Sequence, residues 1–161
     1  MARQPARYGG CLVGPDATYT YAQLSGVLDE ERDQIDRALA AVLDQTRVIT
    51  VAQLTAIQQL RAKLNARLEK FFDEFDLLLT PTMPTEAFAA EGPPTAEIDG
   101  LPIPLLGAVA FTCPFNFSGH PAASVPAGLQ IIAPRHRDDL VLQAARAYEK
   151  IRPWNDNWPR L

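Results

Sequence analysis

Apolar residues recur at intervals of three or four positions through the middle of the chain. Just before them, Thr50 and Gln53 have the spacing of a capping box, which marks the start of a helix. The apolar series itself is Leu54, Ile57, Leu60, Leu64, Leu68, Phe71 and Phe75. This spacing predicts one helix of about 25 residues, roughly 37 Å long at 1.5 Å per residue.

Shorter helices are predicted on either side of this long one. Residues 27–43 carry acidic side chains in their first turns, where the helix dipole favours them, and an apolar face that includes Ile35 and Leu39. Towards the other end of the chain, we expect Asp138 or Asp139 to cap a helix that runs to about Ile151.

Two short apolar runs are predicted to be strands. One is Asp76–Thr80 (DLLLT), which stops at a proline, and the other is Leu129–Ala133 (LQIIA). Tyr19–Tyr21, in which tyrosine alternates with threonine, is a third candidate strand. Asp99–Gly100 is predicted to be a turn.

We interpret the chain as a single domain or domain fragment, residues 1–161, with four stretches. These are an irregular start at 1–26, helices leading into a strand at 27–80, a proline-rich excursion at 81–106, and a final stretch at 107–161 that ends in a helix. Hydrophobic residues at 47% and charged residues at 21% are close to the globular average, so we expect a packed core rather than disorder.

Charge and cysteine content narrow the class of protein. A formal net charge of −4 argues against nucleic acid or an anionic membrane as the main partner. No stretch approaches the ~18 uninterrupted apolar residues of a membrane span, and the start MARQPARYGG is not a secretory signal. Cys11 and Cys113 form no CxxC motif, so neither a metal site nor a disulfide framework is indicated. A cytoplasmic protein is the expectation.

The run at 111–128 reads FTCPFNFSGHPAASVPAG and contains a proline or glycine every few residues. Such a run excludes a long helix and predicts loop, short strand and turn. Asn116 and Ser118 are small polar residues set among phenylalanines. The backbone shape of this segment is therefore expected to matter more than its side chains.

This run resembles the C-terminal signature of the amidase-signature family, which are serine amidohydrolases that cleave or transfer amide nitrogen. The matching residues are Phe111, Thr112, Pro114, Asn116, Ser118, Gly119, Pro121, Ala122, Ser124, Val125, Pro126, Ala127 and Gly128. An earlier stretch, FFDEFDLLLTPTMP, resembles a second landmark of the family, a long helix that leads into a strand.

The resemblance implies an α/β fold: the C-terminal part of the family's mixed sheet, with flanking helices. It also implies hydrolysis of an amide C–N bond through an acyl-serine, without a cofactor. The residues that it implies as substrate-binding cleft wall are Phe111, Thr112, Cys113, Pro114, Phe115 and Asn116. The alternative is that Asn116 and Ser118 only satisfy buried backbone groups in an irregular segment.

The family's catalytic triad cannot be transferred to this sequence. It consists of a serine activated through a second serine and a lysine, in a glycine- and serine-rich stretch. The chain has three serines and three lysines, and none lies in such a stretch: Ser25, Ser118, Ser124, Lys63, Lys70 and Lys150. We therefore assign no catalytic residue.

Other chemistry is not favoured by the remaining polar residues. Ser118 and His120 are two positions apart, and such residues rarely meet as nucleophile and base, so a turn-capping hydroxyl and a loop imidazole are expected. His136 is flanked by arginines, which disfavour metal binding together with Asp138 or Asp139. No metal site is predicted.

One departure from the family pattern concerns the link between Gly128 and Leu129. The family has an insertion there, whereas here the two residues are adjacent, which leaves only Ala127 and Gly128 to connect two antiparallel strands. Either the insertion is deleted and the hairpin is compromised, or the sequence omits a loop that the real molecule contains.

Three hypotheses follow for function. In the first, the chain is the C-terminal segment of an amidohydrolase that acts on a small-molecule amide, with the triad supplied by an upstream segment. In the second, it is a catalytically inactive structural module that self-associates through an open sheet edge. The third, a fragment of an amidotransferase subunit, ranks last because the acidic chain shows no RNA-binding signal.

Overall fold

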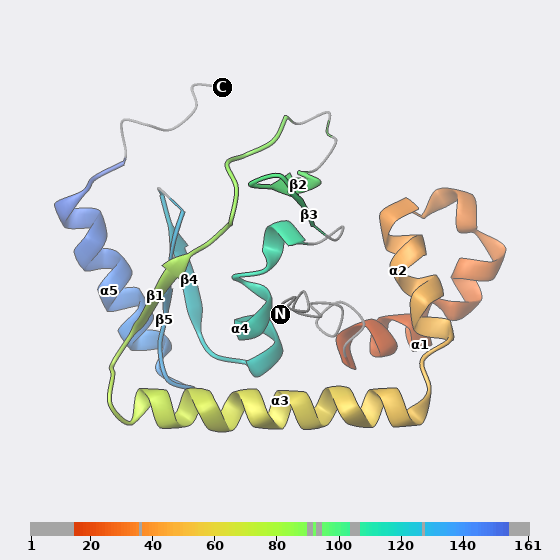
Figure 1. Ribbon diagram of the computed structural model, residues 1–161, viewed down its shortest axis with the longest axis horizontal. Coiled ribbons are helices and arrows are strands. Elements are labelled where there is room, and N and C mark those ends of the chain that lie inside the picture. Colours follow the sequence, from red (N-terminus) through yellow and green to blue (C-terminus); the bar gives the residue numbers. More distant parts are fainter. Residues whose placement is uncertain are drawn as a thin grey trace. The chain divides into compact units, whose positions relative to one another are not determined.

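The computed structural model describes residues 15–35, 37–89, 92, 95–103, 107–126 and 128–154. They belong to two compact units, Met1–Lys63 and Leu64–Leu161, and we describe each unit by itself (Figure 1). The expectation of an irregular start lies outside the described residues for positions 1–14.

The first unit is helical. It contains α1 (Pro15–Glu30), the 3-10 turn η2 (Arg32–Gln34), α2 (Arg37–Arg47) and the first part of α3 (Val51–Phe72). Leu43 and Ala40 of α2 are buried, and the residues packed against them are Tyr21, Leu24 and Ile35.

Two sequence predictions in this unit are wrong. A single helix at 27–43 does not form, because the chain breaks at η2 and Ile35 is extended. The break lets apolar residues on either side of it pack together, which a straight helix prevents by holding its two ends apart. Tyr19–Tyr21 is not a strand but part of α1, so the irregular start expected at 1–26 does not extend over residues 15–26.

The capping box at the start of α3 is confirmed. The Thr50 N–H donates to Gln53 Oε1 over 2.9 Å, and the Gln53 N–H donates to Thr50 Oγ1 over 3.2 Å. Each side chain thus satisfies a backbone donor that the helix leaves open. The long helix is confirmed as well, with 22 residues, and ends before Phe75.

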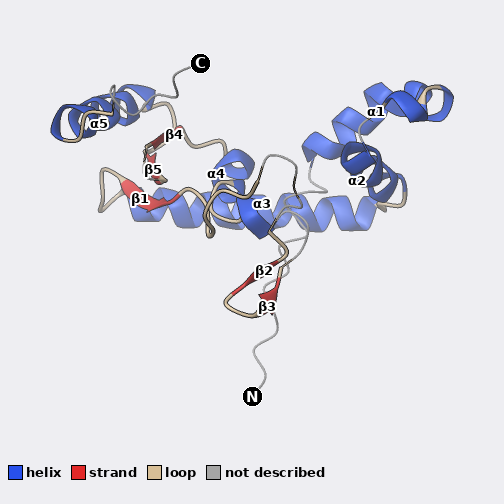
Figure 2. Cartoon of the chain, turned by 90° about the horizontal axis from the view of Figure 1, so that it is seen from above, coloured by secondary structure: helices blue, strands red, loops and turns tan. Residues whose placement is uncertain are grey.

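The second unit is built on a three-stranded antiparallel sheet in the order β1-β5-β4: β1 (Leu78–Pro81), β5 (Leu129–Ile132) and β4 (Ala122–Val125). Helix α5 (Asp138–Ile151) covers one face of this sheet, while α4 (Cys113–Ser118) and residues 64–72 of α3 lie on the other (Figure 2). Both strands predicted from the sequence are present, and the mixture of helices and strands agrees with the expected α/β class.

The core of this unit joins the sheet to α3 and α4. Ile132 of β5, Leu68 of α3 and Phe115 of α4 are buried together, with Leu78 and Phe72 packed against them. On the opposite face of the sheet, Val141 of α5 is buried. Because side chains pack on both faces of the sheet, β5, the central strand, is the most buried of the three.

The predicted cap of α5 is wrong in position. Arg137 occupies the cap without a side-chain hydrogen bond, and Asp138 and Asp139 lie in the first turn. There they face the positive end of the helix dipole. Asp139 also accepts hydrogen bonds from the Arg137 guanidinium, at 2.9 Å and 3.1 Å.

The β4–β5 hairpin closes without the family's insertion. Val125 pairs with Leu129, so three residues, 126–128, make the connection. Gly128 has φ +68°, a conformation that glycine adopts without strain. The expectation that a deletion here would compromise the hairpin is therefore wrong. In the proline-rich stretch, the predicted turn Asp99–Gly100 is confirmed between β2 (Glu97–Ile98) and β3 (Leu101–Pro102).

Candidate functional site

The signature run begins with a short helix rather than the predicted loop and strand. After the 3-10 turn η3 (Gly107–Val109), the chain forms α4, with Pro114 in its first turn, where the missing N–H costs nothing. Gly119 ends the helix with φ +75°, and its N–H donates to the Phe115 carbonyl over 2.8 Å. The prolines and glycines do exclude a long helix, but they leave room for six residues.

The six predicted cleft-wall residues do not share one surface. Phe115 is buried in the core, whereas Phe111 and Asn116 are exposed. Thr112 and Pro114 are half-buried, and the Thr112 hydroxyl donates to the Val109 carbonyl over 3.1 Å. The segment thus anchors itself through Phe115 and leaves Phe111 and Asn116 exposed.

Cys113, the remaining predicted cleft residue, is disulfide-bonded in the structure. The sequence did not indicate a disulfide, because two cysteines so far apart form no recognisable motif. Its sulfur is therefore not a free thiol that would act on a ligand.

A buried glutamine holds the start of the run against the sheet. Gln130 of β5 is only 3% exposed, and its Nε2 donates to the Phe111 carbonyl over 3.0 Å and to Thr80 Oγ1 over 2.9 Å. Sequence reasoning did not single out this residue. The available signal was one amide side chain inside the apolar strand LQII, where a polar group needs partners.

A second polar link lies at the same end of the sheet. Thr82 Oγ1 and Ser124 Oγ are 3.0 Å apart, and the Thr82 N–H donates to the Gly128 carbonyl over 2.6 Å. Thr80, Gln130 and Ser124 occupy paired positions of the three strands. A row of polar side chains therefore crosses this end of the sheet.

Ser118 and His120 do meet, contrary to the expectation from their spacing. His120 Nδ1 lies 2.9 Å from Ser118 Oγ. However, Ser118 is 0% exposed and His120 6% exposed, so no substrate reaches the hydroxyl. The Ser118 hydroxyl also donates to the Phe115 carbonyl, and the Ser118 carbonyl accepts from Arg135 Nη2 over 2.6 Å. The contacts indicate a structural pair at the end of α4.

The surroundings of His120 favour its neutral form. Burial lowers the pKa of the imidazole below its usual 6.5, and the nearby Arg135 guanidinium lowers the pKa further, against a smaller opposing effect of Glu69. The ring also stacks on Phe72, with 5.5 Å between ring centroids.

Within the described ranges, no three His, Cys, Asp or Glu side chains come together as metal ligands would. Of the helices in the described part of the chain, none is both long and apolar enough to cross a membrane.

Comparison with known proteins agrees with the family resemblance of the signature run. Residues 18–142 match the family model described as Amidase. An acylamidase from Rhodococcus erythropolis is 30% identical over 142 residues, which cover 81% of this chain and 30% of that protein. A glutamyl-tRNA(Gln) amidotransferase subunit from Cyanothece sp. is 38% identical over 113 residues, which cover 65% of this chain and 22% of that protein.

The fold is also similar to a solved structure. A bacterial aryl acylamidase of the amidase signature family superposes with a TM-score of 0.73 at 35% identity, over 87% of this chain and 32% of that one. The chain thus spans between 22% and 32% of the length of these relatives. Because the family model covers most of its residues, the chain belongs to the Amidase family.

Proposed function

We propose that this chain forms the C-terminal part of an amidase-type amidohydrolase and contributes core and one wall of the substrate cleft. The reaction is hydrolysis of an amide C–N bond through an acyl-serine, with backbone N–H groups holding the oxyanion. A segment outside the 161 residues supplies the serine, second serine and lysine. Family membership and the partial length relative to the relatives support this proposal.

The observation that carries the proposal is the rigid mounting of the signature run. Phe115 is fixed in the core and the Phe111 carbonyl is fixed by Gln130, so the backbone between them has little freedom. A cleft wall needs this rigidity, because a catalytic site tolerates only small displacements of the groups that position the substrate. Phe111 and Asn116 are the exposed side chains of this wall.

A chimera tests the proposal. The part of the Rhodococcus erythropolis acylamidase that precedes the matched region is fused to this chain, and hydrolysis of p-nitroacetanilide is followed by release of coloured p-nitroaniline. We expect the chimera to hydrolyse the anilide, and the acylamidase part alone to be inactive. A chimera that unfolds cooperatively on heating but has no activity would contradict the proposal.

A matched control distinguishes an effect of the cleft wall on catalysis from a general effect on stability. Asn116→Ala in the chimera changes an exposed side chain of the wall, whereas Gln143→Ala changes an exposed side chain of α5. We expect Asn116→Ala to reduce kcat/KM by about tenfold, the loss of one hydrogen bond to a substrate, and Gln143→Ala to leave it unchanged.

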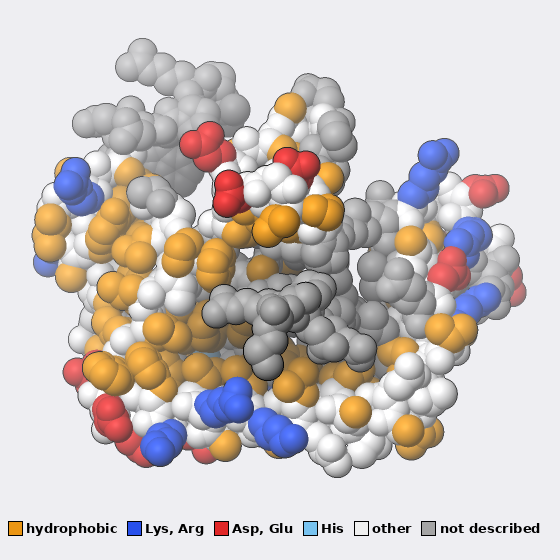
Figure 3. All heavy atoms as spheres, viewed as in Figure 1, with side chains coloured by type: hydrophobic (Ala, Val, Ile, Leu, Met, Phe, Trp, Pro, Cys, Tyr) orange, Lys and Arg blue, Asp and Glu red, His pale blue; other side chains and the backbone are white. Residues whose placement is uncertain are grey.

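One observation favours the alternative of a self-associating, inactive module. Among the described strands, β1 and β4 are the edges of the sheet, and Leu79 of β1 is 57% exposed. Hydrophobic side chains gather over the region of α5 and β1 (Figure 3). Light scattering decides this alternative: a concentration-dependent mass above that of the monomer supports it, and a monomer at all concentrations contradicts it.

An amidotransferase role is the third candidate. One relative is named as a subunit of an enzyme acting on Glu-tRNA(Gln), and the role would require this chain to work beside an RNA substrate. The net charge of −4 disfavours a direct contact with RNA. Absence of tRNA binding at low salt would exclude a direct contact.

A further inference from the structure

A groove with a volume of about 590 Å³ lies in the second unit, beside the polar end of the sheet. Its lining includes Met83, Thr85, Glu86, Ala87, Phe88 and Gly128. These residues come from two segments, the stretch after β1 and the β4–β5 turn. The hydrogen bond from the Thr82 N–H to the Gly128 carbonyl ties the two segments together. The groove is therefore a product of the tertiary fold.

The apolar part of the lining can hold the body of a small organic molecule. The Phe88 side chain is 46% exposed, which leaves its ring accessible, and Met83 is half-buried beside it in the lining. Methionine adapts its shape to a ligand, and an aromatic ring offers a flat apolar face. Together they favour an aryl or alkyl group as the apolar body of a ligand.

The polar side chains of the lining are one carboxylate and one hydroxyl, Glu86 and Thr85. The Glu86 side chain is exposed, and among the described residues no Lys, Arg or His forms an ion pair with it. Thr85 Oγ1 is shielded from solvent and has no hydrogen-bond partner in the described part of the chain. A shielded hydroxyl without a partner favours a ligand that forms a hydrogen bond with it, and this hydroxyl can donate or accept.

Because Glu86 is negatively charged, an ammonium group fits this lining better than other groups of similar size. It brings three N–H donors and a positive charge, which the Glu86 carboxylate attracts. The face of an aromatic ring such as Phe88 also attracts cations. A carboxylate would instead be repelled by Glu86, and an alcohol would gain hydrogen bonds without the charge.

We propose that this groove binds a small organic ammonium ion with an apolar body, such as an arylalkylamine. Binding requires only residues of this chain and no catalytic step. An amine is one product of amide hydrolysis. A role of the groove in that reaction rests on the proposed function, whereas amine binding itself does not.

Three probes with the same apolar body test the proposal: benzylammonium, benzyl alcohol and benzoate. Each is titrated at matched ionic strength into the ¹⁵N-labelled full chain, and backbone amide shifts are followed. We expect benzylammonium to shift the amides of residues 83–88 and 128 saturably, with a Kd about twofold to fivefold below that of benzyl alcohol, as for an exposed ion pair. Benzoate is expected to bind weakest.

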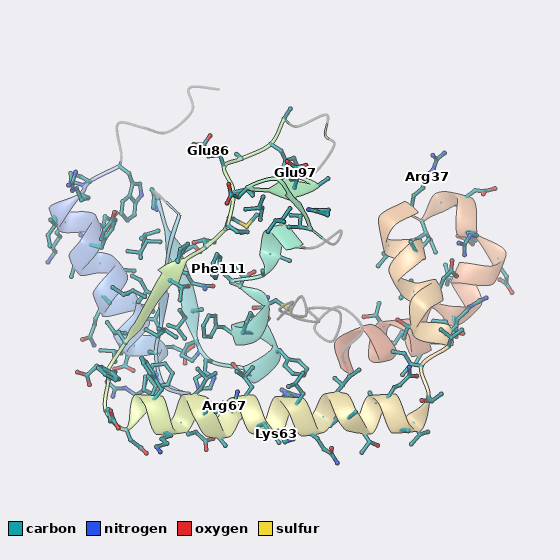
Figure 4. The ribbon with its side chains drawn as sticks, in the orientation of Figure 1. Arg37, Lys63, Arg67, Glu86, Glu97 and Phe111 are labelled. Carbon is teal, nitrogen blue, oxygen red and sulfur yellow. The ribbon has the colours of Figure 1, made fainter. Side chains whose placement is uncertain are left out.

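Glu86→Gln and Glu97→Gln form the matched pair of variants. Both acids are exposed, but Glu86 lines the groove after β1, whereas Glu97 lies on β2 (Figure 4). Glu86→Gln should raise the Kd for benzylammonium to that for benzyl alcohol, and Glu97→Gln should leave both unchanged. Phe88→Ala should weaken both ligands, because it removes the ring that their apolar body contacts.

Two results would overturn the proposal. The first is benzoate binding as tightly as benzylammonium. The second is an equal effect of Glu86→Gln and Glu97→Gln on the Kd for benzylammonium, which would indicate only long-range attraction to an acidic chain. These results are independent of the chimera experiment. An inactive chimera with intact amine binding would remove the proposed function and leave the groove as a binding site.

Discussion

The side-chain amide of Gln130 donates a hydrogen bond to the backbone carbonyl of Phe111, with 3.0 Å between the two atoms. The same nitrogen donates to Thr80 Oγ1, so one amide joins the central strand, its neighbour β1 and the turn that precedes α4. A partly buried carbonyl in an irregular segment needs such a partner, and the sheet supplies it. The signature run is positioned by this side chain.

Gln130→Leu should destabilise the second unit. The substitution keeps the approximate volume but leaves the Phe111 carbonyl without its donor, which costs about 1–3 kcal/mol. Urea unfolding followed by circular dichroism measures the loss. Gln143→Leu on the exposed side of α5 is the control and should change stability by less than about 0.5 kcal/mol. Equal effects of the two substitutions would show that the hydrogen bonds of Gln130 contribute nothing.

Stability should fall in mild acid because of His120. Its pKa is lowered in the folded chain, chiefly by burial, so the unfolded chain binds the proton more readily. The contribution is therefore complete above the usual pKa of 6.5 and is lost as the pH falls below it towards the lowered value. Urea unfolding at pH values between about 7 and about 5 measures this slope.

Two variants identify the group responsible for that slope. His120→Gln should remove most of the pH dependence in this range, whereas His136→Gln, at an exposed histidine, should retain it. Asp44 and Asp139 do not interfere, because hydrogen bonds from Arg32 and Arg137 lower their pKa values below the usual 3.8. A slope that survives His120→Gln would assign the effect to another group.

Alanine substitution at two glycines should have opposite effects on stability. Gly119 ends α4 with φ +75°, and an added Cβ would meet no atom within 4 Å, so Gly119→Ala costs only backbone strain, about 1–2 kcal/mol. Gly26 lies inside α1, also with open space around it, and Gly26→Ala should stabilise by about 0.5–1 kcal/mol. Urea midpoints measure both, and a common sign would contradict the backbone explanation.

Removal of the capping box should loosen the first turn of α3. Thr50→Ala removes the oxygen that accepts the Gln53 N–H, at a cost of about 1 kcal/mol. We expect the Gln53 amide to exchange with deuterium about fivefold faster, while Thr50→Ser, which keeps the oxygen, exchanges at nearly the original rate. Unchanged protection in Thr50→Ala would mean that packing alone fixes this end.

Local patterns in the sequence predicted the structural features that depend on residues close together along the chain. Four features rest on residues within a few positions of one another: the capping box, the long α3, the strands β1 and β5, and the Asp99–Gly100 turn. The break between α1 and α2 was missed, because it is stabilised by apolar contacts across the break, such as Leu24 with the Leu43 cluster. Helical spacing on either side of the break gave no sign of it.

The candidate site was predicted in part. The sequence indicated the signature run and its resemblance to the amidase-signature family, which the family match confirms. It did not indicate which residues of the run face the core, nor the role of Gln130, because both depend on strands far away along the chain. That the six named residues bind substrate stays a prediction, although they do not all lie on one surface.

The sequence by itself therefore determined the family, the α/β class and the elements whose signals are local. Only the tertiary structure decided that Ser118 and His120 meet in a buried pair, that Phe115 anchors the run while Phe111 stays exposed, and that Glu86 and Phe88 share a groove with Gly128. The physical reason is that periodicity and capping act within a few residues. Burial and side-chain partners are instead set by segments that meet only when the sheet has formed.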